Sequence, residues 1–196
     1  MAQHIAFLRA INVGGRRVKM EALGAYFVEL SFGNVRTFVA SGNVVFDSPL
    51  KAAALESRIE QHLLSKLGYE VETFVRSLAE LQEVSADVER LFAGELAGGA
   101  QVYVGFLREL PAAANRKQVI GLSNRVDVLS FGERELYWLG HQGMGESTVT
   151  GPRLAKALGG PTTTRNITSL RKLIAMCALH GKTEPRPAGR GSRDKQ

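Results

Sequence analysis

The chain has 196 residues, 44% of them hydrophobic, and a formal net charge of +6. This length allows one large domain or two small ones, and the hydrophobic share is sufficient for a globular core. No apolar run approaches the roughly 18 residues of a membrane span, so we expect a cytoplasmic protein without a membrane partner. Arg9 interrupts the apolar N-terminus, which we interpret as a strand rather than a secretion signal.

The first half of the chain alternates strand-like and helix-like patterns of apolar residues. The expected order is strand, helix, strand, strand, helix, strand, over about residues 4–11, 20–31, 35–41, 44–47, 50–67 and 69–75. Gly68 is the natural C-cap of the second helix. In the last strand, the glutamates alternate with Tyr69, Val71 and Thr73, so we expect one face of this strand to be exposed and the strand as a whole to be half exposed. This order is that of a ferredoxin-like unit, which we assign to residues 1–77.

A helical connector is expected next, and the second half repeats the same plan less completely. We assign residues 78–99 to the connector, with a glycine- and alanine-rich break at 93–100. The further expected elements are strand, helix, two strands and two helices, over about 102–106, 111–122, 126–131, 135–139, 152–158 and 167–177. The segment 162–166 occupies the place of a fourth strand. The sequence therefore predicts an α+β fold of two ferredoxin-like halves with antiparallel sheets. The second half, 100–181, is imperfect and ends in a helix, and only the order of elements repeats.

The last fifteen residues, 182–196, carry five cations and two acids and are rich in proline, glycine and serine. This composition predicts a disordered basic tail. Because the tail accounts for +3 of the net charge, the folded part is only mildly basic. The high isoelectric point is therefore weak support for nucleic-acid binding.

The ferredoxin-like strand order, 4-1-3-2, predicts which loops meet. The end of the first strand and the turn between the second and third strands lie at the same edge of the sheet. Asn12, Gly14 and Gly15 are therefore expected near the turn of Ser41, Gly42 and Asn43, as one polar rim. By the same logic, the hairpin at Arg134 shares an edge of the second half with residues 162–166.

Two adjacent glycines, Gly14 and Gly15, lie among the cations Arg9, Arg16, Arg17 and Lys19. Such a loop is either a backbone nest for phosphate or carboxylate, or a tight loop in which the glycines only allow a positive φ. The GK[ST] ending of a Walker loop is missing, and so is the third glycine of a dinucleotide fingerprint. Of the cations, we prefer Arg9 as a site residue, because it lies at the end of the strand; Arg16 and Arg17 are expected to point to solvent.

The segment before the last helix has two interpretations. Thr164 or Asn166 is suited to capping the helix N-terminus. With Arg165, the same N-terminus is suited to holding an anion.

No pattern points to a metal or to a catalytic group. The four histidines do not cluster at metal-ligand spacings, and with one cysteine a structural zinc site is not expected. Cys177 falls on the apolar stripe of the last helix and excludes an internal disulfide, so we expect a buried thiol. No cofactor is evident, and catalytic residues are not identified.

Several of these segments also resemble a known family. The runs Arg9 to Gly15, Val35-Arg36-Thr37, Ser41 to Phe46 and Thr163 to Asn166 closely resemble, in order and spacing, a family of bacterial cytosolic proteins known as domain of unknown function 1697. The resemblance covers about residues 4–180. This chain departs from the usual family residues at three positions, Ala10, Ala40 and Ile167. The resemblance implies an α+β fold with two related halves, and no catalytic residues, because the family's activity is unassigned.

Three functions remain open from the sequence. The first is a binding module for a phosphate-bearing ligand, either a nucleotide or a nucleic acid. The second is an enzyme acting on a small anionic substrate at the rim, and the third is a protein-interaction domain. The candidate ligand-binding residues are Arg9, Asn12, Gly14, Gly15, Arg36, Ser41, Gly42, Asn43, Thr164, Arg165 and Asn166.

Overall fold

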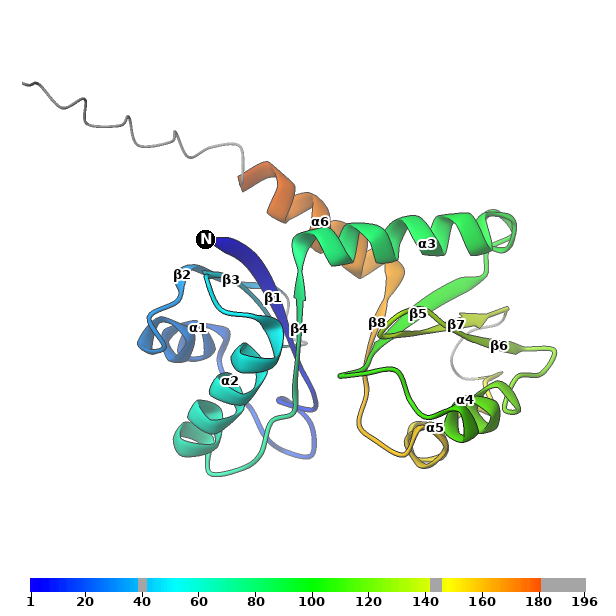
Figure 1. The fold of residues 1–196 in the computed structure, drawn as a ribbon, viewed down its shortest axis with the longest axis horizontal. Coiled ribbons are helices and arrows are strands. Elements are labelled where there is room, and N and C mark those ends of the chain that lie inside the picture. The colour runs from blue at the N-terminus through cyan, green and yellow to red at the C-terminus, as the bar shows by residue number, and fades with distance from the viewer. Residues whose placement is uncertain (39–41, 142–145, 181–196) are drawn as a thin grey trace, which may run out of the picture.

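The computed structural model describes residues 1–38, 42–141 and 146–180, apart from the side chain of His180. These residues form an α+β fold with six helices and two four-stranded antiparallel sheets, one in each half of the chain (Figure 1). The expected α+β class is thereby confirmed. The predicted basic tail lies outside the described residues. In the described part of the chain, no helix is long and apolar enough to cross a membrane.

The elements of the first half follow in the order expected, and the second half has one strand more than expected. In the first half they are β1 (Ala2–Leu8), α1 (Met20–Glu29), β2 (Gly33–Phe38), β3 (Asn43–Ser48), α2 (Ala52–Leu67) and β4 (Thr73–Ser77). A long helix, α3 (Leu78–Ala97), leads to the second half. There the elements are β5 (Gln101–Phe106), α4 (Ala113–Ile120), β6 (Asp127–Phe131), β7 (Glu135–Gly140), α5 (Gly151–Leu158), β8 (Thr163–Asn166) and α6 (Ile167–His180). The strand orders are β2-β3-β1-β4 and β6-β7-β5-β8.

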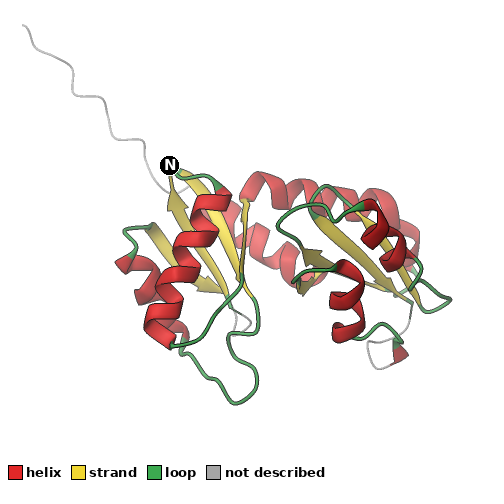
Figure 2. Cartoon of the chain, turned by 60° about the horizontal axis from the view of Figure 1, so that its bottom comes forward, coloured by secondary structure: helices red, strands yellow, loops and turns green. Residues whose placement is uncertain are grey.

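Helices cover the outer faces of both sheets, and a shared core lies between the inner faces. α1 and α2 cover one face of the first sheet, and α4 and α5 one face of the second (Figure 2). Apolar residues of these helices pack against the sheets. The inner faces of both sheets meet one side of α3 and of α6 in a single buried cluster. Cys177 is part of that cluster, which confirms the expected buried thiol.

Two strands differ from their expected limits. β1 ends at Leu8 rather than at residue 11, because Ala10 has a φ of 53°, which an extended strand does not adopt. β4 begins at Thr73 rather than at residue 69, and it is buried rather than half exposed. Its inner face packs against the second half of the molecule, which the alternation of the sequence does not reveal.

The second half is more complete than the sequence predicted. Residues 163–166 form the missing fourth strand, β8, which pairs antiparallel with β5. Consecutive threonines favour an extended backbone, so the segment suits a strand. The break expected at 93–100 is also shifted, because α3 continues through the alanine-rich segment to Ala97, with a kink at Phe92.

The two sheets place corresponding residues at corresponding positions. Phe7 of β1 lies opposite Asn43 of β3, and Phe106 of β5 lies opposite Glu135 of β7. On the fourth strand, Phe7 lies opposite Phe74 of β4, and Phe106 lies opposite Thr163 of β8. An arginine follows two residues after each of these partners, Arg76 in β4 and Arg165 in β8.

The residues after these arginines cap the following helices. Ser77 accepts a hydrogen bond from the backbone N–H of Glu80, and Asn166 accepts one from that of Thr168. The cap predicted for Asn166 is thereby confirmed. Besides the order of elements, a phenylalanine and an arginine thus recur at corresponding positions of the two sheets.

Candidate functional site

Arg165 brings the predicted turn at Asn43 and the predicted segment 163–166 together. Its Nε donates a hydrogen bond to Oδ1 of Asn43 over 2.7 Å, and one terminal nitrogen donates to the carbonyl oxygen of Leu8 over 3.3 Å. The guanidinium lies 5.6 Å from the ring centroid of Phe7. An arginine of the second half thus binds acceptor groups at the end of the first sheet.

Arg76 makes the reciprocal contacts from the first half to the second. Its Nε donates to Oε1 of Glu135 over 2.7 Å, and one terminal nitrogen donates to the carbonyls of Leu107 and Arg134 over 2.7 and 2.8 Å. Its guanidinium lies 5.4 Å from the ring centroid of Phe106. Sequence reasoning missed this residue, although a cation within the apolar run of β4 was a signal for it.

The two arginines flank a pair of stacked rings. The rings of Phe7 and Phe106 lie 4.1 Å apart with an interplanar angle of 14°. Burial lowers the pKa of the Arg165 guanidinium to about 10. Burial also lowers the pKa of Arg76, which the carboxylate of Glu135 opposes. Both side chains remain charged near neutral pH. We call these residues the inter-half joint: Phe7, Asn43, Arg76, Phe106, Glu135 and Arg165.

The glycine loop lies at a different place, between β1 and α1. Gly14 and Gly15 have φ values of +65° and +83°, which confirms that the loop uses their freedom to adopt a positive φ. Oδ1 of Asn12 accepts a 2.7 Å hydrogen bond from the backbone N–H of Val18 and so ties the two ends of the loop together.

The loop lines an open surface hollow of about 470 Å³, which we call the Gly-loop hollow. Its lining residues are Asn12, Gly15, Arg16, Arg17, Val18 and Lys19. α1 starts directly after Lys19, and no side chain of the described residues caps it there. The uncapped N–H groups at the start of a helix add positive potential to that of the cations.

Two described residues of the predicted polar rim, Asn12 and Gly15, line the Gly-loop hollow. Gly42 lies against the end of β1, where its carbonyl accepts a hydrogen bond from the N–H of Leu8, but neither Gly42 nor Asn43 lines the Gly-loop hollow. Arg9, the cation that we preferred, forms an ion pair with Glu72 outside the hollow. Two of the three cations that line the hollow, Arg16 and Arg17, are those that we expected to point to solvent.

The remaining predicted residues are spread over other places. Thr164 lies opposite Gly105 within the second sheet. Arg36 lies on β2. Burial raises the pKa of the Cys177 thiol on α6, and the nearby charge of Arg36 opposes that rise. Ser41 lies outside the described residues.

A second hollow, of about 440 Å³, lies between the halves, and its lining has three acids and one cation. It is lined by Glu60, Gln61, Leu64, Glu70, Val71, Glu72, Arg108 and Pro161. Within it, Arg108 forms an ion pair with Glu60, which links the two halves at the surface. The surplus of carboxylates makes this hollow unsuited to a phosphate group. In the described ranges, no three histidine, cysteine or acidic side chains are grouped so that they could hold a metal ion.

Comparisons with known proteins agree with the fold and give the family. The solved structure of a conserved bacterial protein, SP0830, from Streptococcus pneumoniae matches 91% of this chain and 99% of its own, with 22% identity and a TM-score of 0.71. This likeness shows a shared fold. The comparison with curated proteins gives no match. The model of the family described as "Protein of unknown function (DUF1697)" matches residues 1–137. Since that match spans more than half of the chain, the protein belongs to the DUF1697 family.

Proposed function

We propose that the protein binds a phosphate-bearing anion in the Gly-loop hollow. The observation that carries this proposal is the charge of the lining: three of its six residues are the cations Arg16, Arg17 and Lys19, and none is an acid. None of the ion pairs between described residues involves these three side chains. Their charge is therefore available to a ligand, and a concave surface concentrates the positive potential.

Binding fits this lining better than catalysis does. General acid–base chemistry needs a group that exchanges a proton near neutral pH, most often histidine or a carboxylate. The described lining offers guanidinium, ammonium, amide and apolar groups. We therefore favour the binding module over the enzyme acting on an anionic substrate.

We further propose that each half is a ferredoxin-like unit in a cytoplasmic protein. The strand orders β2-β3-β1-β4 and β6-β7-β5-β8 support the first part, because both are the 4-1-3-2 order of such a unit. The second part stays a prediction from the sequence.

The test is a thermal-shift titration and calorimetry with inorganic pyrophosphate. We expect pyrophosphate to raise the melting temperature of the wild type, because a ligand that binds only the folded state stabilises it by mass action. The triple variant Arg16→Gln, Arg17→Gln, Lys19→Gln is expected to bind at least about tenfold more weakly, which corresponds to about 1.4 kcal/mol.

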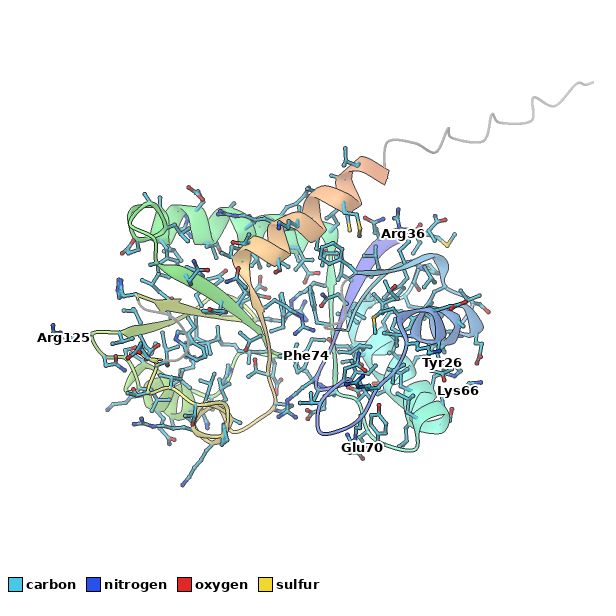
Figure 3. The ribbon with its side chains drawn as sticks, turned by 180° about the vertical axis from the view of Figure 1, so that it is seen from behind. Tyr26, Arg36, Lys66, Glu70, Phe74 and Arg125 are labelled. Atoms are coloured by element: carbon cyan, nitrogen blue, oxygen red, sulfur yellow. The ribbon has the colours of Figure 1, made fainter. Side chains whose placement is uncertain are left out.

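The control is a triple variant with the same loss of charge on the other half of the molecule. Lys117→Gln, Arg125→Gln and Lys156→Gln alter exposed cations there, and Arg125 lies at the far end of the molecule from the first sheet (Figure 3). This variant is expected to bind pyrophosphate as the wild type does. Equal weakening in both triple variants, or no binding by the wild type at millimolar concentration, contradicts the proposal.

A further inference from the structure

One of the residues that line the Gly-loop hollow, Arg16, stacks on an aromatic ring behind it, that of Tyr69. The guanidinium of Arg16 lies over the ring of Tyr69, 4.1 Å from the centroid. The hydroxyl of Tyr69 donates a 3.2 Å hydrogen bond to the carbonyl of Ile11, which fixes the ring at the base of the loop. Arg16 is exposed and lines the hollow, so the face of its guanidinium that is turned away from the ring is accessible.

Such a pair has the properties of a platform for a nucleobase. A guanidinium is planar and weakly hydrated, and it stacks on π-systems on either face. Proteins that read single nucleotides stack bases on aromatic rings and on arginine planes. The remaining cations of the hollow, Arg17 and Lys19, are within the same lining and suit the phosphate groups.

We propose that the Gly-loop hollow binds a mononucleotide, with its base on the Arg16–Tyr69 pair and its phosphates at Arg17 and Lys19. This inference rests on the proposed function and names its ligand class. The volume of about 470 Å³ is in the range of small-molecule sites, about 300–1,000 Å³. A single platform takes a single base, whereas grooves for nucleic acid present successive aromatic residues along a strand.

The test compares ATP with pyrophosphate by calorimetry at fixed ionic strength. In the wild type, ATP is expected to bind about five- to a hundredfold more tightly than pyrophosphate, which is the range that one stacked base contributes. Arg16→Lys keeps the charge and removes the planar guanidinium, so it is expected to abolish the preference for ATP over pyrophosphate.

Substitutions of the tyrosine supply the matched comparison. Tyr69→Leu is expected to abolish the preference for ATP, whereas Tyr69→Phe keeps the ring and the preference. Tyr26 is a second tyrosine with a cation over its ring, Lys66, and both lie outside the hollow (Figure 3). Tyr26→Leu is expected to leave the preference unchanged. Melting curves of each variant verify that it is folded, and Arg16→Lys, on an exposed side chain, carries the test if Tyr69→Leu unfolds.

The possible results separate the two proposals. If ATP and pyrophosphate bind equally to the wild type, or the preference survives in Arg16→Lys and Tyr69→Leu, the base platform is wrong and the anion site stands. If neither ligand binds, both proposals are wrong. If an eight-nucleotide single-stranded RNA binds more tightly than ATP, with an affinity that falls steeply with salt, a nucleic-acid surface replaces the mononucleotide site.

Discussion

His4 is a titratable side chain that the fold buries in the first strand. Its ring lies 5.8 Å from that of Phe46, between centroids. Burial lowers the pKa of His4 below its ordinary value of 6.5, and the backbone of Ser48 and the nearby carboxylates of Asp47 and Glu80 offset part of that shift. The unfolded chain therefore binds a proton near pH 6.5, while the folded chain resists it.

This difference predicts how stability depends on pH. The contribution of His4 is fully present above pH 6.5 and is lost as the pH falls below that value toward the lowered pKa, at up to about 1.4 kcal/mol per pH unit. His4→Phe is expected to remove this loss, as measured by urea unfolding at pH 7.5 and pH 5.5. His141→Phe, at an exposed position, should keep the wild-type dependence; a similar flattening in both variants contradicts the assignment to His4.

Individual side chains were the least predictable part of this molecule. Arg165 was a candidate from the sequence, but its partners Asn43 and Leu8 come from the other half of the chain, more than 100 residues away. Arg76 was missed for the same reason. Spacing along the chain determines which face of its own sheet a residue occupies, and it contains no information about how two sheets meet.

At the scale of elements, the turn into β3 depends on Gly42. Its φ is +76°, and a Cβ added there would lie 2.7 Å from Cγ2 of Ile11 and 3.2 Å from Cβ of Leu8, both buried. The turn thus needs glycine for its backbone conformation and for space. Gly68, at the end of α2, has a φ of +74° and no other atom within 4 Å of such a Cβ.

The comparison of these two glycines separates the two effects. Gly68→Ala is expected to cost about 1 kcal/mol, because only the left-handed conformation opposes the methyl group. Gly42→Ala is expected to cost a further 1–3 kcal/mol, roughly, because the methyl group overpacks a filled core. Urea unfolding of both variants measures the difference. Equal losses of unfolding free energy would show that the residues around Gly42 move aside for the methyl group at no cost in stability, against this prediction.

Most elements were predictable, because their signals are local. The helix over 50–67 and its cap at Gly68 follow from apolar spacing and one glycine, and the structure has them at Ala52–Leu67 and Gly68. Strand β8 was not predictable in this way, since its four residues become a strand only through pairing with β5. Likewise, the burial of β4 on both faces depends on contact with the other half.

At the scale of the whole molecule, the inter-half joint determines whether the halves act as one unit. Arg76 and Glu135 are both buried and belong to different sheets. Removal of one partner from a buried ion pair leaves a buried charge without compensation, which costs several kcal/mol. The stability of either half therefore depends on the other.

Glu135→Gln is expected to lower the free energy of unfolding by about 3 kcal/mol. Trp138, the only tryptophan, reports on the second half by fluorescence, while far-UV circular dichroism reports on both halves. Both signals are expected to shift to lower urea together. Glu133→Gln, the same change at an exposed position two residues away, should be nearly neutral; comparable losses in the two variants contradict a special role for the buried pair.

The joint has the symmetry of a homodimer, but its chemistry is not symmetric. Asn43 and Glu135 occupy corresponding positions, so Arg76 meets a carboxylate and Arg165 an amide oxygen. If two first halves paired with each other, each would bury its Arg76 against the amide of Asn43 and lose the carboxylate that compensates its charge. One substitution at a repeated position thus makes the two halves of this chain better partners for each other than the first half is for its own copy, which opposes the pairing of two first halves from different molecules.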